Sequence, residues 1–225
     1  QKALKEAKIV ASARTAATGE ANGFTRIPGP GEYDPDPAAA YLHITSNNTI
    51  KGTQFHDFPD AGGVPLVADM SSDFLWRPFD ANRFHLIYAG AQKNVGPSGV
   101  TIVIVRKSWL EKANGGLPTM LRYSTFADNE SLYNTPPTFA IYMVRNVLEW
   151  VRDDGGLAAM EARNRQKGGL LYGTIEAHPA FYRCPVDPAS RSYMNVVFRL
   201  PSEELEAKFV AEAKARGMVG LKGHR

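Results

Sequence analysis

The chain has 225 residues, of which 44% are apolar and 22% are charged, so it can bury a sizeable core. Lys and Arg number 26 against 23 Asp and Glu, and this balance of +3 is spread along the chain, so nothing in it favours a nucleic-acid binder. The longest apolar run, 100–105, is too short to span a bilayer. Cys184 is the only cysteine, which excludes an internal disulfide and favours a cytoplasmic protein.

The first half of the chain reads mainly as strands separated by loops. Residues 2–8 continue an amphipathic helix, 9–13 suggest a strand, and the Gly- and Pro-rich segment 18–37 is a loop. Further strands are predicted at 41–46, 65–68, 85–89 and 100–105. The last of these is nearly all apolar and β-branched, which is typical of a strand buried on both faces.

The second half reads mainly as helices. A helix is predicted over 139–151 after two prolines, and Gly155 and Gly156 end it. A second helix, 157–176, is expected to be interrupted near Gly168 and Gly169. A strand at 193–200 and a helix from about 201 to 216 follow, the latter stopped by Gly217.

This order of elements predicts an α/β fold. Strands with crossovers indicate a parallel or mixed sheet in a large domain, residues 1–153. Residues 154–225 would form a connecting helix and part of a smaller α+β domain.

The segment Tyr88 to Gly99 places Lys93 between two predicted strands, among small residues. An arbitrary lysine on a loop is usually solvated. At a strand end walled by Gly and Ala, however, a lysine is well placed to form a Schiff base with a carbonyl, and burial can lower its pKa.

Asp69 follows the apolar run 65–68 and so stands at the carboxyl end of a strand, where α/β sheets bind ligands. It could cap a turn through the backbone of Ser71 or Ser72. It could equally pair with a ligand cation, such as a protonated pyridine nitrogen. Spacing alone does not separate the two interpretations.

Five short segments, in order, resemble the phosphoserine aminotransferase family. They are Ser46-Asn47-Asn48-Thr49-Ile50, Ala68-Asp69-Met70-Ser71-Ser72, Tyr88-Ala89-Gly90-Ala91-Gln92-Lys93-Asn94, Tyr133-Asn134-Thr135-Pro136-Pro137-Thr138 and Lys222-Gly223-His224-Arg225. The resemblance implies a fold-type I enzyme that uses pyridoxal 5′-phosphate (PLP). It also implies a homodimer with active sites at the interface. The expected reaction transfers an amino group from glutamate to 3-phosphohydroxypyruvate, giving phosphoserine for serine biosynthesis; some family members also use 4-phosphohydroxythreonine.

The resemblance also assigns roles to residues. Lys93 matches the Schiff-base lysine that also moves the proton at Cα, and Asp69 matches the carboxylate that keeps the pyridine nitrogen protonated. The other matches are Thr49 for the ring's phenolic oxygen, Gln92 for the cofactor phosphate, Asn134 and Thr135 for the partner subunit's cofactor phosphate, and His224 and Arg225 for the substrate phosphate.

Taken alone, most of these residues have simpler interpretations. Thr49 could be an ordinary turn residue, and Asn134 with Thr135 could cap the helix that follows. His224, beside the chain end, would be read as part of a loose tail. The remaining histidines lack the spacing of metal ligands, so no metal site is predicted.

Both ends of the chain look like cuts through a larger fold. The family's N-terminal phosphate-binding loop and ring-stacking aromatic have no counterpart here, nor does a later substrate-binding arginine. Unpaired buried strand edges are costly, so we expect the chain to depend on a companion fragment. Two alternatives stay open: another fold-type I PLP enzyme, such as a cysteine desulfurase, or a non-catalytic piece with a structural role. The surroundings of Cys184 argue against a desulfurase.

Overall fold

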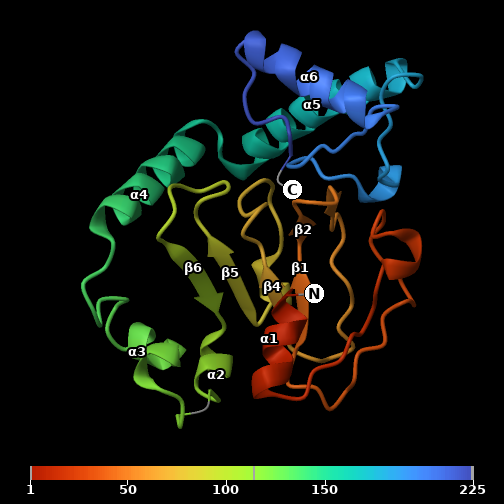
Figure 1. Cartoon of the computed structure of the whole chain (residues 1–225). Coiled ribbons are helices and arrows are strands. Elements are labelled where there is room, and N and C mark those ends of the chain that lie inside the picture. The colour runs from red at the N-terminus through yellow and green to blue at the C-terminus, as the bar shows by residue number, and fades with distance from the viewer. Residues whose placement is uncertain (1, 114, 224–225) are drawn as a thin grey trace.

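A computed structural model describes residues 2–113 and 115–223. In chain order its helices and strands are α1 (Lys2–Val10), β1 (Leu42–Thr45), β2 (Asn47–Asn48), β3 (Thr53–Gln54), β4 (Leu66–Asp69), β5 (Leu86–Gly90), β6 (Thr101–Val105), α2 (Lys107–Leu110), α3 (Tyr123–Ala127), α4 (Thr138–Asp153), α5 (Gly156–Ala177) and α6 (Glu203–Ala215). Figure 1 shows a sheet with helices α4, α5 and α6 at one end and the shorter helices α2 and α3 toward the other. Short 3₁₀ turns occur at Glu20–Asn22, Ala81–Arg83, Thr119–Leu121 and Pro188–Ser190.

The main sheet has the order β1-β4-β5-β6, and its first three strands are parallel. Thr45 pairs with Asp69, so β1 and β4 end in register, and Asp69 pairs with Tyr88, two residues before the end of β5. β6 runs antiparallel to β5 at the edge. The sheet is therefore mixed, and the strands expected near 41–46, 65–68, 85–89 and 100–105 are confirmed. β2 and β3 form a separate hairpin beyond the end of β1.

One face of the sheet forms the hydrophobic core. Alternate residues of the parallel strands point to this face, and they are joined there by aromatic and aliphatic side chains from the loops. The buried cluster includes Leu42, Ile44, Leu66, Ala68, Ile87, Ala89 and Phe74. On the opposite face the register aligns partly exposed residues instead, among them His43, Asp69 and Tyr88.

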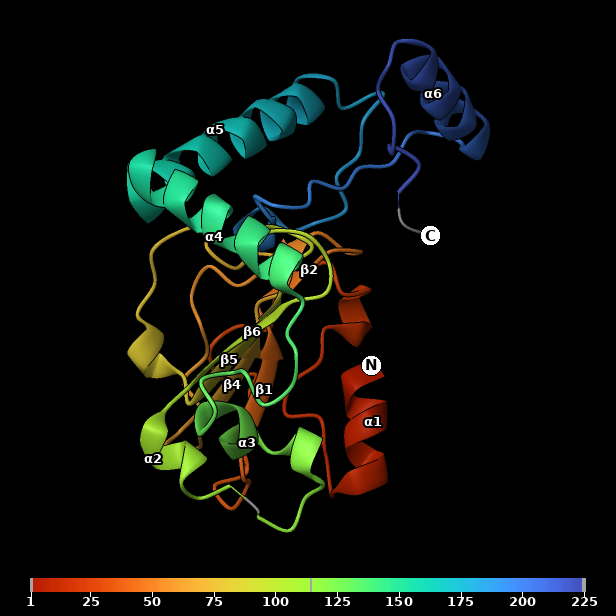
Figure 2. The ribbon, with the colours of Figure 1, turned by 90° about the vertical axis from the view of Figure 1, so that its left-hand side faces the viewer.

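The helices α4, α5 and α6 lie at the end of the sheet where the parallel strands finish, and both views agree on this (Figures 1 and 2). Gly155 and Gly156 have φ of 96° and 69°, which is the left-handed backbone that ends α4 and starts α5. Ser202 caps α6, with its Oγ accepting from the Leu205 N–H at 3.2 Å. Gly217 follows α6 with φ of 82°, as predicted.

The expected interruption of the helix near Gly168 and Gly169 is wrong, because α5 is continuous over this stretch. Gly168 has a packing role. A Cβ at this position would lie 2.7 Å from Cδ1 of Tyr193, so only glycine lets that ring approach the helix. Gly169 has open space around it.

Three strand predictions are also wrong. Residues 9 and 10 continue α1, where their side chains are exposed. Residues 193–200 form no strand in the described part of the chain; their only ladder contact is an isolated bridge between Arg183 and Arg199. β6 is a strand but is not buried on both faces, because it lies at the sheet edge with Val103 and Ile104 exposed.

No helix in the described residues is long and apolar enough to cross a membrane.

Candidate functional site

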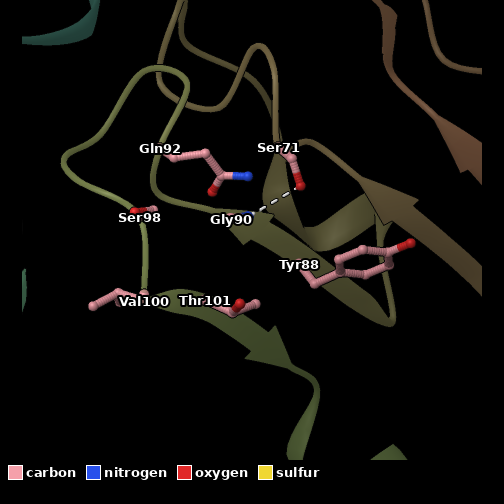
Figure 3. A pocket seen from close by; sticks show the side chains of 8 residues that line it. Ser71, Tyr88, Gly90, Gln92, Ser98, Val100 and Thr101 are labelled. Atoms are coloured by element: carbon pink, nitrogen blue, oxygen red, sulfur yellow. Dashed lines mark hydrogen bonds between the residues drawn. The ribbon is translucent and has the colours of Figure 1, made fainter. Parts of the chain in front are cut away.

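A pocket of about 470 Å³ lies at the end of β5, between the loops that follow β4 and β5 and the start of β6 (Figure 3). It is lined by Ser71, Tyr88, Gly90, Gln92, Ser98, Gly99, Val100 and Thr101. The Gly90 N–H donates to Ser71 Oγ at 3.0 Å, which ties the loop after β5 to the loop after β4. The Met70 N–H donates to the Tyr88 carbonyl at 2.9 Å and continues the ladder past the strand end. These two hydrogen bonds therefore hold the loop after β4 against β5 at the pocket.

Asp69, the last residue of β4, is partly buried at this edge. Its Oδ1 accepts from the Ser71 N–H at 2.9 Å, so the interpretation of Asp69 as a turn cap is confirmed. Among residues 2–113 and 115–223, no Lys, Arg or His forms an ion pair with this carboxylate. The cap uses one oxygen, so the carboxylate retains capacity to accept from a ligand cation.

Gln92 and Lys93 lie in the loop that follows β5. The Gln92 side chain lies over Gly90, where a Cβ would come within 2.6 Å of its Oε1, and its amide end turns toward Ser71 (Figure 3). The side chain of Lys93 is exposed in the chain described here. The enclosing wall expected around it is therefore not supplied by the neighbouring Gly and Ala residues.

The turn that carries Lys93 is nevertheless firmly held. Ala91 and Val95 on either side are fully buried, and the Val95 N–H donates to the Ala91 carbonyl at 3.0 Å. Asn94 Nδ2 donates to the Phe74 carbonyl at 2.7 Å, which anchors the turn to the segment after β4. An exposed amine on a fixed backbone can meet a ligand without first ordering its loop.

Thr49 occupies the turn between β2 and β3, beyond the end of β1. Asn48 Oδ1 accepts from the N–H groups of Ile50 and Lys51 at 3.1 Å each and shapes this turn. The Ser46 N–H donates to the Asp69 carbonyl at 2.9 Å and links the start of the hairpin to the end of β4. The structure thus brings Thr49, Asp69, Gln92 and Lys93 to one end of the sheet.

Asn134 and Thr135 lie elsewhere, in the segment between α3 and α4, and both are exposed. Their recorded contact is local, from Asn134 Nδ2 to the Thr135 carbonyl at 3.2 Å. Neither residue caps α4, because the helix begins at Thr138 after Pro137, which has no side-chain cap. His224 and Arg225 lie outside the described residues.

Sequence reasoning missed a contact behind Asp69 on the same face of the sheet. Tyr88 OH and His43 Nε2 lie 3.0 Å apart, and the two rings are stacked. Burial and the neighbouring Asp69 charge raise the pKa of Tyr88 to about 12, while burial lowers the pKa of His43. The signal was available in the alternation of the two strands, which places both side chains on the face of Asp69.

A buried carboxylate, Asp73, was also missed. It lies four residues after Asp69 and accepts hydrogen bonds from Ser46 and Gln54. Burial raises its pKa to about 6, although the two hydrogen bonds and the Arg77 charge oppose this shift. The polar run Ser71-Ser72-Asp73 after an apolar strand was the available clue.

This set of groups fits a cofactor with a protonated ring nitrogen and an aldehyde. Asp69 supplies an acceptor without an ion-pair partner in the described chain, and Lys93 supplies a primary amine. The pocket is lined by residues near each of them in the sequence, Ser71 and Gln92, and not by Asp69 or Lys93 themselves. Nothing comparable exists for a metal: no group of three or more His, Cys, Asp or Glu gathers as ligands within residues 2–113 and 115–223.

A mixed α/β sheet with a lysine loop after one strand and a carboxylate at the end of its neighbour defines a class of aminotransferase-like folds. The aminotransferase class-V family model matches residues 32–224 of this chain. The chain belongs to the aminotransferase class-V family. The α/β fold-type I expectation is thereby confirmed.

Within this family, the chain is most usefully compared with individual phosphoserine aminotransferases. The chain is 56% identical over 225 residues to the phosphoserine aminotransferase of Lysinibacillus sphaericus. It matches the solved phosphoserine aminotransferase of Bacillus circulans subsp. alkalophilus with a TM-score of 0.97 at 55% identity. It also matches the PLP-bound enzyme of Trichomonas vaginalis with a TM-score of 0.92 at 35% identity, over 99% of this chain and 64% of that one. The chain is covered completely by the two bacterial relatives but spans only 62% of their length.

Proposed function

We propose that this chain carries the core of a PLP-dependent phosphoserine aminotransferase, which moves an amino group between glutamate and 3-phosphohydroxypyruvate. One observation carries the proposal: adjacent parallel strands place Asp69 and the Lys93 loop at one end of the sheet, beside a pocket. The similarity to phosphoserine aminotransferases over the whole chain supports the substrate class.

Each residue at this edge has a distinct task in the proposal. Asp69 would hold the cofactor's pyridine nitrogen through a charge-assisted hydrogen bond, using the lone pairs that Ser71 leaves free. Thr49 would donate to the phenolic oxygen, and Gln92 would contact the phosphate from its place over Gly90. His224 and Arg225 would bind the substrate phosphate.

When bound, PLP supplies an electron sink for the pair that remains after a proton leaves the substrate's Cα. Lys93 Nζ would hold the cofactor covalently at rest. Once displaced by the amino group of the donor, Nζ would act as the general base at Cα and then return the proton at the cofactor's exocyclic carbon. The fixed turn around Lys93 supports this role, because Val95 and Asn94 anchor its backbone and the amine would not need its loop to be ordered first.

A homodimer with shared sites is part of the proposal, as is a cytoplasmic location. Asn134 and Thr135 are exposed and contact each other locally, which suits a role at the partner subunit's cofactor phosphate. Large apolar side chains are exposed on the same segment and on α4, including Leu132 at 61% and Phe139 at 73%. Such a surface suits burial against a second copy. A mass measurement in solution distinguishes this arrangement from association with a companion fragment.

An amino-transfer assay tests the proposal. The purified protein, supplied with PLP and 2-oxoglutarate, should convert phosphoserine and leave unphosphorylated serine nearly untouched. Replacing Lys93 by Ala should lower kcat/KM at least about 1,000-fold, because both the covalent anchor and the general base are lost. Equal rates with serine, or sulfur release from cysteine, would instead favour another fold-type I PLP enzyme. The absence of any turnover by a correctly folded protein would favour the non-catalytic alternative.

A further inference from the structure

A buried network of polar side chains adjoins Asp69 of the candidate site, which it contacts through Ser46. Its members come from four separate segments: the β1–β3 region, the loop after β4, α5 and the segment near residue 192. They are Ser46, Asn47, Gln54, Ser72, Asp73, Tyr172, Ser192 and Asn195. Ser46, Asn47, Gln54, Asp73 and Ser192 are each less than 5% exposed, so their hydrogen bonds have little competition from water.

Asp73 is the acceptor at the centre of this network. Oδ1 accepts from Ser46 Oγ, and Oδ2 accepts from Gln54 Nε2 at 3.0 Å. Gln54 Oε1 in turn accepts from the Tyr193 N–H at 3.0 Å. A single carboxylate therefore joins the residue after β1, the residue at the end of β3 and its own segment after β4.

Ser46 connects Asp73 to the candidate site. Its N–H donates to the Asp69 carbonyl at 2.9 Å, and its Oγ lies 3.1 Å from the same carbonyl. A hydroxyl has one hydrogen and here faces two acceptors, the Asp69 carbonyl and the Asp73 carboxylate. The strength of the hydrogen bond from Ser46 Oγ to the Asp69 carbonyl therefore depends on how strongly Asp73 competes for the same hydrogen.

The contact between Ser46 and Asp69 joins the two segments that carry proposed cofactor-binding residues. Asp69 lies at the end of β4, and Thr49 lies three residues after Ser46 in the β2–β3 hairpin. Contacts to one rigid ring from two segments need both backbones at a fixed separation, since a displacement of about 1 Å can cost about 100-fold. Tyr172 serves as a contrast, because its OH donates to the Ser192 carbonyl at 2.8 Å and not directly to the hairpin or to the end of β4. Ser192 in turn bonds to Asn47 and Gly52 of the hairpin, so Tyr172 acts on the hairpin only at one remove.

We propose that Asp73 is a positioning residue of the candidate site, which acts through Ser46 to hold the β2–β3 hairpin and its Thr49 against the end of β4 and its Asp69. The role rests on the proposed function, because it presumes that Thr49 and Asp69 bind PLP. Asp73 is itself buried, so in this proposal it contacts neither substrate nor cofactor.

The test compares Ser46→Ala with Tyr172→Phe in the purified full chain. Each variant removes one buried hydroxyl that donates to a carbonyl, but only the first hydroxyl contacts Asp69 and Asp73. For each variant, the dissociation constant for PLP and the visible absorbance of the bound cofactor are measured, together with the denaturant midpoint without PLP. Asp73→Asn serves as a second variant that keeps the shape of the side chain, in case Ser46→Ala does not fold.

We expect Ser46→Ala to weaken PLP binding about 10- to 100-fold and to shift the cofactor absorbance. Asp73→Asn should act in the same direction, whereas Tyr172→Phe should change the PLP dissociation constant less than about twofold despite a similar loss in denaturant midpoint. Unchanged PLP binding in Ser46→Ala and Asp73→Asn would overturn the positioning role alone. Equal weakening by Tyr172→Phe would also overturn it, since the effect would then follow stability. A wild-type protein that does not bind PLP would overturn the proposed function and the positioning role together.

Discussion

Two regions at the same end of the sheet differ sharply in how their side chains are held. Gln92 and Lys93, which are proposed to meet the cofactor from the loop after β5, are exposed. Ser46, Gln54 and Asp73 are almost fully buried, and each makes hydrogen bonds to another segment.

The buried residues hold the backbone of the site in place, whereas the exposed residues are the ones proposed to contact the cofactor. A buried polar network is stable only when its donors and acceptors are paired, and once paired it permits few alternative arrangements. Exposed side chains on a fixed backbone stay free to change partners during a reaction. On this account, damage to the network changes stability and placement, and damage to the exposed residues changes chemistry.

The largest effect is expected from Gln54→Leu. The substitution roughly keeps the volume but leaves two buried partners unpaired, Asp73 Oδ2 and the Tyr193 N–H. Because one of them belongs to a carboxylate, we expect the free energy of unfolding to fall by about 4 kcal/mol. Denaturant titration measures this directly. A loss below about 1 kcal/mol would show that the network is not the support described here.

A smaller effect concerns pH and Asp73. Burial raises the pKa of this carboxyl from 3.8 to about 6, so the folded protein holds the proton more tightly than the unfolded chain. The resulting stabilisation is complete below about pH 4 and is lost as the pH rises through about 6; a shift of this size corresponds to roughly 3 kcal/mol. Charges at Arg77 and Asp69 act on the same group and are present in both proteins compared next.

Unfolding of wild type and Asp73→Asn should be measured from about pH 4 to about pH 7. Taking the difference between the two proteins removes the contributions of other titrating groups. We expect wild type to lose stability relative to Asp73→Asn across this range. A constant difference would contradict the proposed ionisation of a buried carboxyl.

The smallest expected effect is the difference in stability between alanine substitutions at two neighbouring glycines of α5. Gly168→Ala places a methyl 2.7 Å from the Tyr193 ring and should lower the free energy of unfolding by about 2 kcal/mol, despite the better helix propensity of Ala. Gly169→Ala has open space and should raise it by about 0.5–1 kcal/mol. Thermal unfolding of both variants checks the pair, and equal shifts would mean that Tyr193 does not pack as described.

The sequence predicted local features better than tertiary ones. Alternation and apolar runs located β1, β4, β5 and β6, and Ser202 with Gly217 marked the ends of α6. The burial of β6 was mispredicted because composition does not reveal that a strand lies at a sheet edge. The break at Gly168 was mispredicted because the reason for that glycine, the Tyr193 ring, lies 25 residues later in the chain.

In the candidate site, too, local features were predicted better than tertiary contacts. Asp69, Gln92 and Lys93 stand next to strands in the sequence, so their meeting at one end of the sheet could be predicted. The polar run after β4 gives a clue to Asp73, but its contacts could not be predicted, because its partners Ser46 and Gln54 are 27 and 19 residues distant in the sequence. The predicted roles of individual site residues and the domain division at 153 and 154 stay predictions.

Mass spectrometry after borohydride reduction tests the central claim most directly. The purified protein is mixed with PLP, reduced, and examined as intact chain and as peptides. The account predicts a pyridoxyl group fixed on Lys93 Nζ and absent from the other lysines. An unmodified Lys93 in the presence of excess PLP would contradict it, and would mean that the similarity to aminotransferases reflects ancestry without the chemistry.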